Sequence, residues 1–259
     1  MVIVYLIYDA RSLRACSLTC YSLYIAAVPH LHHTLTIDIY LTMRGLQECL
    51  PKYHSSQCTN RIQHMNKQDL LPFVKKLRIC GTFIDYSRMF YPELASCSLL
   101  HKLSALSNVR ELLIEYLDIS TFTRRPQRLF RHFLPTVQSL ALMRPMGTHR
   151  QIIYFIGLFQ HLEDLKFSQM SPYPEPKQEY SVDDPTLIPH FSPPLRGQLT
   201  VPFCLEPKVL ADMISLFGGL QFRSMDLDCV DGIHLLLDAC AKTLETLRLD
   251  LAYCYCKQL

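Results

Sequence analysis

The sequence predicts an α/β fold in which parallel strands lie side by side and each strand is followed by a helix on the outer side. A short pattern (apolar, two residues, apolar, one residue, apolar) occurs six times, and amphipathic stretches separate its copies. The copies start 22 to 60 residues apart, which suits one strand and one helix per repeat. The six copies are Val74–Leu77–Ile79, Val109–Leu112–Ile114, Val137–Leu140–Leu142, Leu162–Leu165–Phe167, Phe222–Met225–Leu227 and Leu244–Leu247–Leu249.

Each copy predicts a strand with one buried face. Its last two apolar residues are two apart, as one face of a strand requires, and the first belongs to the turn that enters the strand. A looser copy, with one extra residue, consists of Leu195, Leu199 and Val201 and divides the longest interval roughly in two. The residues that we expect to be buried in one row are Leu77, Leu112, Leu140, Leu165, Met225 and Leu247.

Three of the intervening stretches predict helices. Thr148 and Gln151 form a capping box for the first. Pro207 suits the first turn of the second, which Gly218 and Gly219 end, and Asp231 is the expected N-cap of the third. The apolar stripes are Ile152, Phe155, Ile156 and Phe159; Leu210, Met213, Ile214 and Phe217; and Leu235, Leu236 and Ala239.

The spacing L-x-x-L-x-L in these copies resembles the leucine-rich-repeat family, although the usual Asn after it is absent. The resemblance covers about residues 70 to 259 and implies an irregular solenoid, which we assign to residues 69–259. Within it, residues 171–194 contain seven prolines, which are incompatible with a helix or a central strand. We therefore expect an exposed insertion there, and both a spacer and a partner-binding loop remain open.

The N-terminal stretch predicts a small helical segment. Leu13, Cys16, Cys20, Leu23 and Ala27 recur at helical spacing, and Pro29 is expected to end the pattern. Residues 34–39 alternate and suit an edge strand. We assign residues 1–40 to this segment and the polar residues 41–68 to a linker.

This segment resembles the second half of an F-box, and the phrase is close to that of fungal F-box-like proteins, which carry a repeat domain downstream. The matching residues are Asp9, Ser12, Leu13, Cys16, Leu18, Cys20, Pro29, His30 and Leu31. An F-box docks on the adaptor of a cullin-type ubiquitin ligase. The resemblance therefore implies adaptor contacts from Leu13, Cys16, Leu18, Cys20, Leu23, Pro29 and Leu31.

Two departures from the F-box pattern set the expected strength of adaptor binding. Only eight residues precede Asp9, where an F-box has Leu-Pro and its first helix, and Leu23 stands nearest the position of the usual Trp. We therefore interpret the segment as a truncated or degenerate F-box. We expect it to bind the adaptor weakly or not at all without a complete first helix.

Composition and motif content exclude several other functions. The net charge of +3 is too small for a nucleic-acid-binding surface. Eleven cysteines without a C-x-x-C motif indicate reduced thiols in a cytoplasmic or nuclear protein. The uncharged run from Ala15 to Ile37 is too polar to predict a membrane span. No phosphate-binding loop, nucleophile elbow or zinc motif occurs, so we expect no enzyme activity, cofactor or metal.

Strand parity predicts a binding surface. Residues next to the buried ones point to the opposite side, where a solenoid has its concave face, and an apolar centre with a charged rim is typical of protein-binding patches. Plain solvated strand positions are the alternative. The leading interpretation is a substrate receptor of a cullin-type ligase, and the other is a repeat scaffold or degenerate F-box copy without a ligase role. The expected concave face comprises Lys76, Arg78, Glu111, Leu113, Glu115, Ser139, Ala141, Met143, Asp164, Lys166, Ser224, Asp226, Asp228, Thr246, Arg248 and Asp250.

Overall fold

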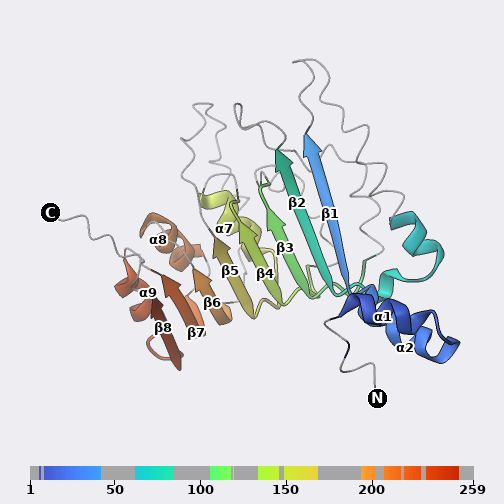
Figure 1. Cartoon of the computed structure of the whole chain (residues 1–259). Coiled ribbons are helices and arrows are strands. Elements are labelled where there is room, and N and C mark those ends of the chain that lie inside the picture. Colours follow the sequence, from blue (N-terminus) through green and yellow to red (C-terminus); the bar gives the residue numbers. More distant parts are fainter. Residues whose placement is uncertain are drawn as a thin grey trace, which may run out of the picture.

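The computed structural model contains one open parallel β-sheet of eight strands in the order β1 to β8, with helices (Figure 1). It describes residues 6, 9–41, 62–83, 106–117, 119, 134–145, 149–168, 194–201, 207–216, 219–228 and 232–250. The strands are β1 (Thr34–Leu41), β2 (Lys76–Phe83), β3 (Glu111–Glu115), β4 (Ser139–Met143), β5 (Asp164–Ser168), β6 (Leu195–Val201), β7 (Leu220–Asp228) and β8 (Thr246–Asp250). The expected strands, their parallel direction and their order are confirmed, and so is the edge strand at residues 34–39.

One row of side chains crosses the whole sheet in register. The row runs through Leu35, Leu77, Leu112, Leu140, Leu165, Leu199, Met225 and Leu247. All of them are at most 1% exposed except Leu247, which is 40% exposed, so its predicted burial is wrong. Leu247 stands on β8, the last strand in the order, and among the described strands β8 pairs with β7 alone.

The turns that enter β2, β3, β4 and β5 repeat one hydrogen-bonding arrangement. In each turn, two successive backbone N–H groups donate to one carbonyl oxygen in the turn that enters the preceding strand. Lys75 and Lys76 donate to His33, and Arg110 and Glu111 donate to Lys75, at 2.8–3.0 Å. The same arrangement continues from Gln138 and Ser139 to Arg110, and from Glu163 and Asp164 to Gln138. This regularity satisfies the entry amides and fixes the register of each new strand.

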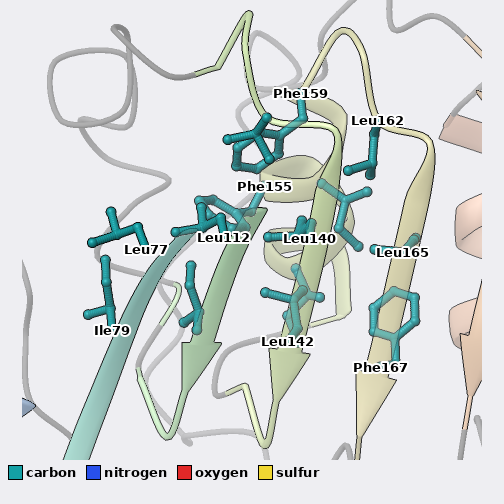
Figure 2. Packing of buried hydrophobic residues seen from close by; sticks show 14 of the residues in the cluster. Leu77, Ile79, Leu112, Leu140, Leu142, Phe155, Phe159, Leu162, Leu165 and Phe167 are labelled. Carbon is teal, nitrogen blue, oxygen red and sulfur yellow. The ribbon is translucent and has the colours of Figure 1, made fainter. Parts of the chain in front are cut away.

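In the described part of the chain beyond β4, three helices pack on the face of the sheet that carries the buried row. They are α7 (His149–Gly157), α8 (Pro207–Leu216) and α9 (Ile233–Cys240). Their buried side chains join one core with the strands. Figure 2 shows part of this core, with Phe155 of α7 and Phe159 just beyond the end of that helix. The two phenylalanine rings meet edge to face with centroids 5.2 Å apart.

The helix ends agree only in part with the sequence. Pro207 opens α8 as expected, whereas Thr148, Phe217 and Gly218 lie outside the described residues. For α9 the expected N-cap is wrong: Gly232 takes that position with a φ of +81°, a left-handed conformation that glycine adopts without strain. Asp231 itself lies outside the described residues.

The loose copy of the pattern coincides with an irregularity in the sheet. The register of β6 against β7 shifts between Gly197 and Gln198 and skips Arg223. Gly197 has a φ of +83°, and a Cβ built there would lie 2.0 Å from the carbonyl oxygen of Glu163. Only glycine fits this close approach between β6 and the turn that enters β5.

Two helices precede the sheet, α1 (Ala10–Ser17) and α2 (Tyr21–Leu31). The expected end of the helix at Pro29 is wrong, because α2 continues to Leu31 with Pro29 inside it. A proline in this last turn gives up one backbone hydrogen bond, to the carbonyl of Ile25, and Ile25 is 52% exposed to water. The expected boundary between residues 40 and 41 falls inside β1.

The expected linker is not irregular throughout. Residues 62–67 are helical, and Ile62 and Met65 are buried in the main core. A short 3-10 helix, η2 (Leu71–Phe73), follows and buries Leu71. Val28 of α2 belongs to the same core, so these elements together cover the inner face near β1. Residues 42–61 and the proline-rich insertion at 171–193 lie outside the described residues.

Candidate interaction surfaces

The pair of helices α1 and α2 is held together by local capping and a small core. Asp9 caps α1: its Oδ1 accepts the backbone N–H groups of Arg11 and Ser12 at 3.0 and 3.1 Å. Its other oxygen accepts the Ser12 hydroxyl, and these bonds lower the pKa of Asp9. The Asp-x-x-Ser part of the F-box-like motif is therefore explained by helix capping.

The small core accounts for several residues that the resemblance assigns to adaptor binding. Leu13 is 1% exposed and packs with Ala27, while Cys16, Leu23 and Leu31 are partly buried against them. Pro29 is also partly buried. These side chains hold the two helices together, and Leu13 has no surface to offer a partner.

The outer side of the pair carries a different set of apolar residues, which we call the helical patch. It consists of Leu18, Tyr21, Tyr24 and Ile25, which are 87%, 77%, 41% and 52% exposed. The two tyrosine rings stack with centroids 6.4 Å apart. Of the expected adaptor contacts, Leu18 belongs to this patch, and Cys20 is exposed beside it.

Sequence reasoning missed the other three members of the helical patch. Positions 21, 24 and 25 share one side of α2, but Val28 lies on the same side one turn further on and is buried in the main core. Helix periodicity therefore groups these residues, and only their packing shows which of them stay exposed.

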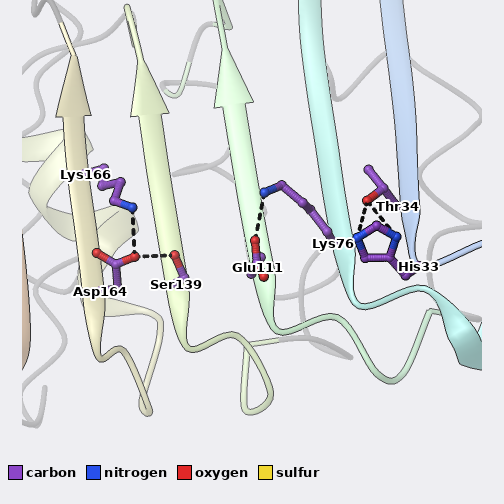
Figure 3. A network of polar contacts seen from close by, with 7 residues as sticks. All are labelled: His33, Thr34, Lys76, Glu111, Ser139, Asp164 and Lys166. Carbon is purple, nitrogen blue, oxygen red and sulfur yellow. Dashed lines mark hydrogen bonds and ion pairs between the residues drawn. The ribbon is translucent and has the colours of Figure 1, made fainter. Parts of the chain in front are cut away.

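The second surface is the side of the sheet opposite the helices, which we call the open face. The residues expected there by strand parity are all partly or fully exposed. Figure 3 shows the region near the strand starts, where polar side chains of neighbouring strands meet. The structure thus brings the expected residues onto one face in register.

At the β2–β3 end of the open face the charges are paired. Lys76 Nζ lies 2.8 Å from Glu111 Oε2, and Arg78 Nη2 lies 2.8 Å from Glu115 Oε2. The Cys80 thiol donates to Glu115 at 3.0 Å. Burial, and then this bond to Glu115, raises the pKa of Cys80 to about 12, so the thiol stays protonated and unreactive at neutral pH.

The middle of the open face is less polar. Leu113, Ala141 and Met143 lie half-buried on β3 and β4. Beside them, Asp164 accepts a hydrogen bond from the Ser139 hydroxyl at 2.9 Å, and Lys166 lies 3.3 Å from the same carboxylate (Figure 3). The arrangement gives an apolar strip between paired charges.

At the β7–β8 end the balance shifts to negative charge. Asp226 and Asp228 on β7 lie beside Arg248 and Asp250 on β8. Arg248 approaches Asp226 only to 3.9 Å and is 78% exposed. Desolvation, and after it the neighbouring carboxylates of Asp250 and Asp226, raise the pKa of Asp228.

Comparisons with protein-family models, curated proteins and solved structures find no match for this chain. Within the described ranges, no helix is long and apolar enough to cross a membrane. In the same part of the chain, no group of three or more His, Cys, Asp or Glu side chains is arranged to hold a metal ion.

Proposed function

We propose that this chain is a substrate receptor of a cullin-type ubiquitin ligase, acting in the cytoplasm or nucleus. In this proposal α1 and α2 form an F-box-like pair that binds the adaptor through the helical patch. The sheet forms an irregular leucine-rich-repeat-like solenoid that binds the protein substrate through its open face. The observation that carries the proposal is the helical patch, an exposed apolar surface on the segment that resembles an F-box.

The buried positions of the third strand support the repeat assignment. A leucine-rich repeat has apolar residues at positions 1, 4, 6 and 11 and Asn or Cys at position 9. Val109, Leu112, Ile114 and Ile119 occupy the apolar positions and are at most 1% exposed. Leu117 occupies the Asn position and is also buried, so an apolar side chain replaces the usual amide inside the turn.

The chemistry of the helical patch supports adaptor binding. Two tyrosines, a leucine and an isoleucine stand exposed together, and aromatic residues are enriched where protein interfaces bury most surface. A contiguous group of exposed apolar side chains is more often an interaction site than ordinary solvated surface. Val28 anchors α2 in the sheet core, so the patch stands on a fixed support.

The adaptor half of the proposal is tested by co-purification with a cullin-ligase adaptor. The chain is assayed as it stands and with an F-box-type first helix added before residue 9. We expect firm binding only with the added helix. Tyr21→Asp with Ile25→Asp should abolish that binding, because two charges would be buried without partners.

The matched control is Ala26→Asp, which places a charge on the same helix about 100° around its axis from Ile25. Ala26 is exposed and lies outside the helical patch, so its variant should bind as the parent does. An extended chain that fails to bind, or that binds despite the charges at positions 21 and 25, would refute the adaptor role.

The substrate half is tested on the open face. Partners captured by the intact chain should be lost when Leu113 and Met143 are both changed to Asp. The control changes Ala211 and Ala241, exposed alanines of the helical layer, to Asp and should keep the partners. Partners retained by the first variant would exclude the open face. If the chain captures partners through the open face but never binds the adaptor, it is a repeat scaffold with no ligase role.

A further inference from the structure

The outer strand β8 has two leucines on its core side that are exposed at the surface. Leu247 and Leu249 are 40% and 42% exposed, although their register partners Met225 and Leu227 on β7 are fully buried. Among the described residues, β8 pairs with β7 and with no other strand. An exposed strand with apolar residues on one side is a template for pairing with another strand.

The residues of β8 restrict which strand can fit. Leu247 and Leu249 lie on the core side, while Thr246, Arg248 and Asp250 lie on the open face. In an antiparallel pair, directly opposite residues share a face. A two-fold axis perpendicular to the sheet would therefore set the leucines of two β8 strands side by side and continue the core row.

The charges of Arg248 and Asp250 favour one of the registers that a two-fold axis allows. An axis at Arg248 would set two arginines opposite each other, which is unfavourable. An axis at Leu249 sets Arg248 opposite the Asp250 of the second copy, and the symmetry makes this pair twice. The second copy would also bring an arginine to the acidic group of Asp226, Asp228 and Asp250.

We propose that two copies of this chain associate through β8, antiparallel and centred on Leu249, to form one continuous sixteen-stranded sheet. Two cross-strand pairs between Arg248 and Asp250 set the register on the open face. On the core side, the axis sets the Leu249 side chains of the two copies opposite each other. This interface is independent of the helical patch and of adaptor binding, so either proposal can fail alone.

The test is sedimentation velocity of the full chain over a concentration series. We expect a monomer–dimer equilibrium for the parent. Arg248→Asp and Asp250→Arg should each weaken it about tenfold, because two attractive cross-strand pairs become repulsive. The double swap R248D/D250R should restore dimerisation, since it rebuilds both pairs with the charges exchanged.

The matched control is Arg223→Asp, which breaks an exposed pair of similar length, Arg223 to Glu245 at 4.0 Å, without changing the residues of β8. This variant should dimerise as the parent does, and circular dichroism checks that every variant is folded. A parent that stays monomeric would overturn the proposal, including a monomer whose β8 amides are protected by another segment of its own chain. The proposal would also be overturned if neither single charge change weakened the dimer, or if the double swap did not restore it.

Discussion

The two outer strands of the sheet carry leucines in the same register row but in opposite environments. Leu35 on β1 is 1% exposed, whereas Leu247 on β8 is 40% exposed. Near β1, α2, residues 62–67 and η2 contribute Val28, Met65 and Leu71 to the core. An apolar strand pattern therefore specifies a strand, while burial at a sheet edge depends on the segment that covers it.

The ion pairs near the two edges of the sheet also differ: the pair near β1 is closer and less exposed than the pair at β8. On β2 and β3, Arg78 and Glu115 approach to 2.8 Å, and Glu115 is only 15% exposed in its side chain. On β7 and β8, Arg248 and Asp226 are 3.9 Å apart and more exposed. Ordered neighbours hold the first pair in place, so it should contribute more to stability than the second.

Shortening each of the two leucines to alanine should give the largest difference between the two outer strands. Leu35→Ala should lower the free energy of unfolding by about 2–5 kcal/mol, as expected for a fully buried leucine, and so should Leu140→Ala at the centre of the row. Leu247→Ala should cost less than about 1 kcal/mol, because much of its surface is already in water. Urea denaturation measures all three, and equal losses at positions 35 and 247 would mean that β8 is covered in solution.

The cover over β1 can be weakened directly. Met65 is 4% exposed, and Met65→Ala should cost about 2 kcal/mol, near the lower end for such truncations. Hydrogen exchange should then become faster in β1 than in β4, since Met65 belongs to the segment at the β1 end of the sheet. Uniformly faster exchange in all strands would show that the cover is not a local feature.

The coupling energies of the two ion pairs should also differ, by less than the leucine substitutions do. A double-mutant cycle on Arg78 and Glu115 should give a coupling energy of about 0.5–1 kcal/mol. The same cycle on Arg248 and Asp226 should give a value near zero in the monomer, because the pair is long and exposed. Measurements in 1 M salt serve as the control, in which exposed couplings shrink.

The smallest expected effect concerns Asp228. Its pKa is raised in the folded state, so ionisation opposes folding: the cost is present at neutral pH and disappears as pH falls below the ordinary aspartate range. Asp228→Asn should therefore stabilise the protein at pH 7 by no more than about 0.5 kcal/mol, and the gain should vanish near pH 3. A gain that grows on acidification would contradict this assignment.

Much of the sheet could be predicted from the sequence. The spacing of Leu112 and Ile114, and of Leu140 and Leu142, identifies strand faces because side chains alternate with a period of two. The same alternation places Lys76, Arg78 and Glu115 together on the open face. The loose copy at Leu195 likewise predicted a strand, which is β6, and its register against β7 shifts beside Gly197.

Local periodicity and short connections are enough to predict which residues form strands, the parallel order of these strands and the apolar side of each one. Which apolar residues are covered follows instead from the packing of the folded chain. Pro29 remains inside α2, Leu13 is buried between two helices, and Leu247 is left at the surface. Burial depends on segments far away in sequence that occupy the neighbouring space, and no local pattern records where those segments pack.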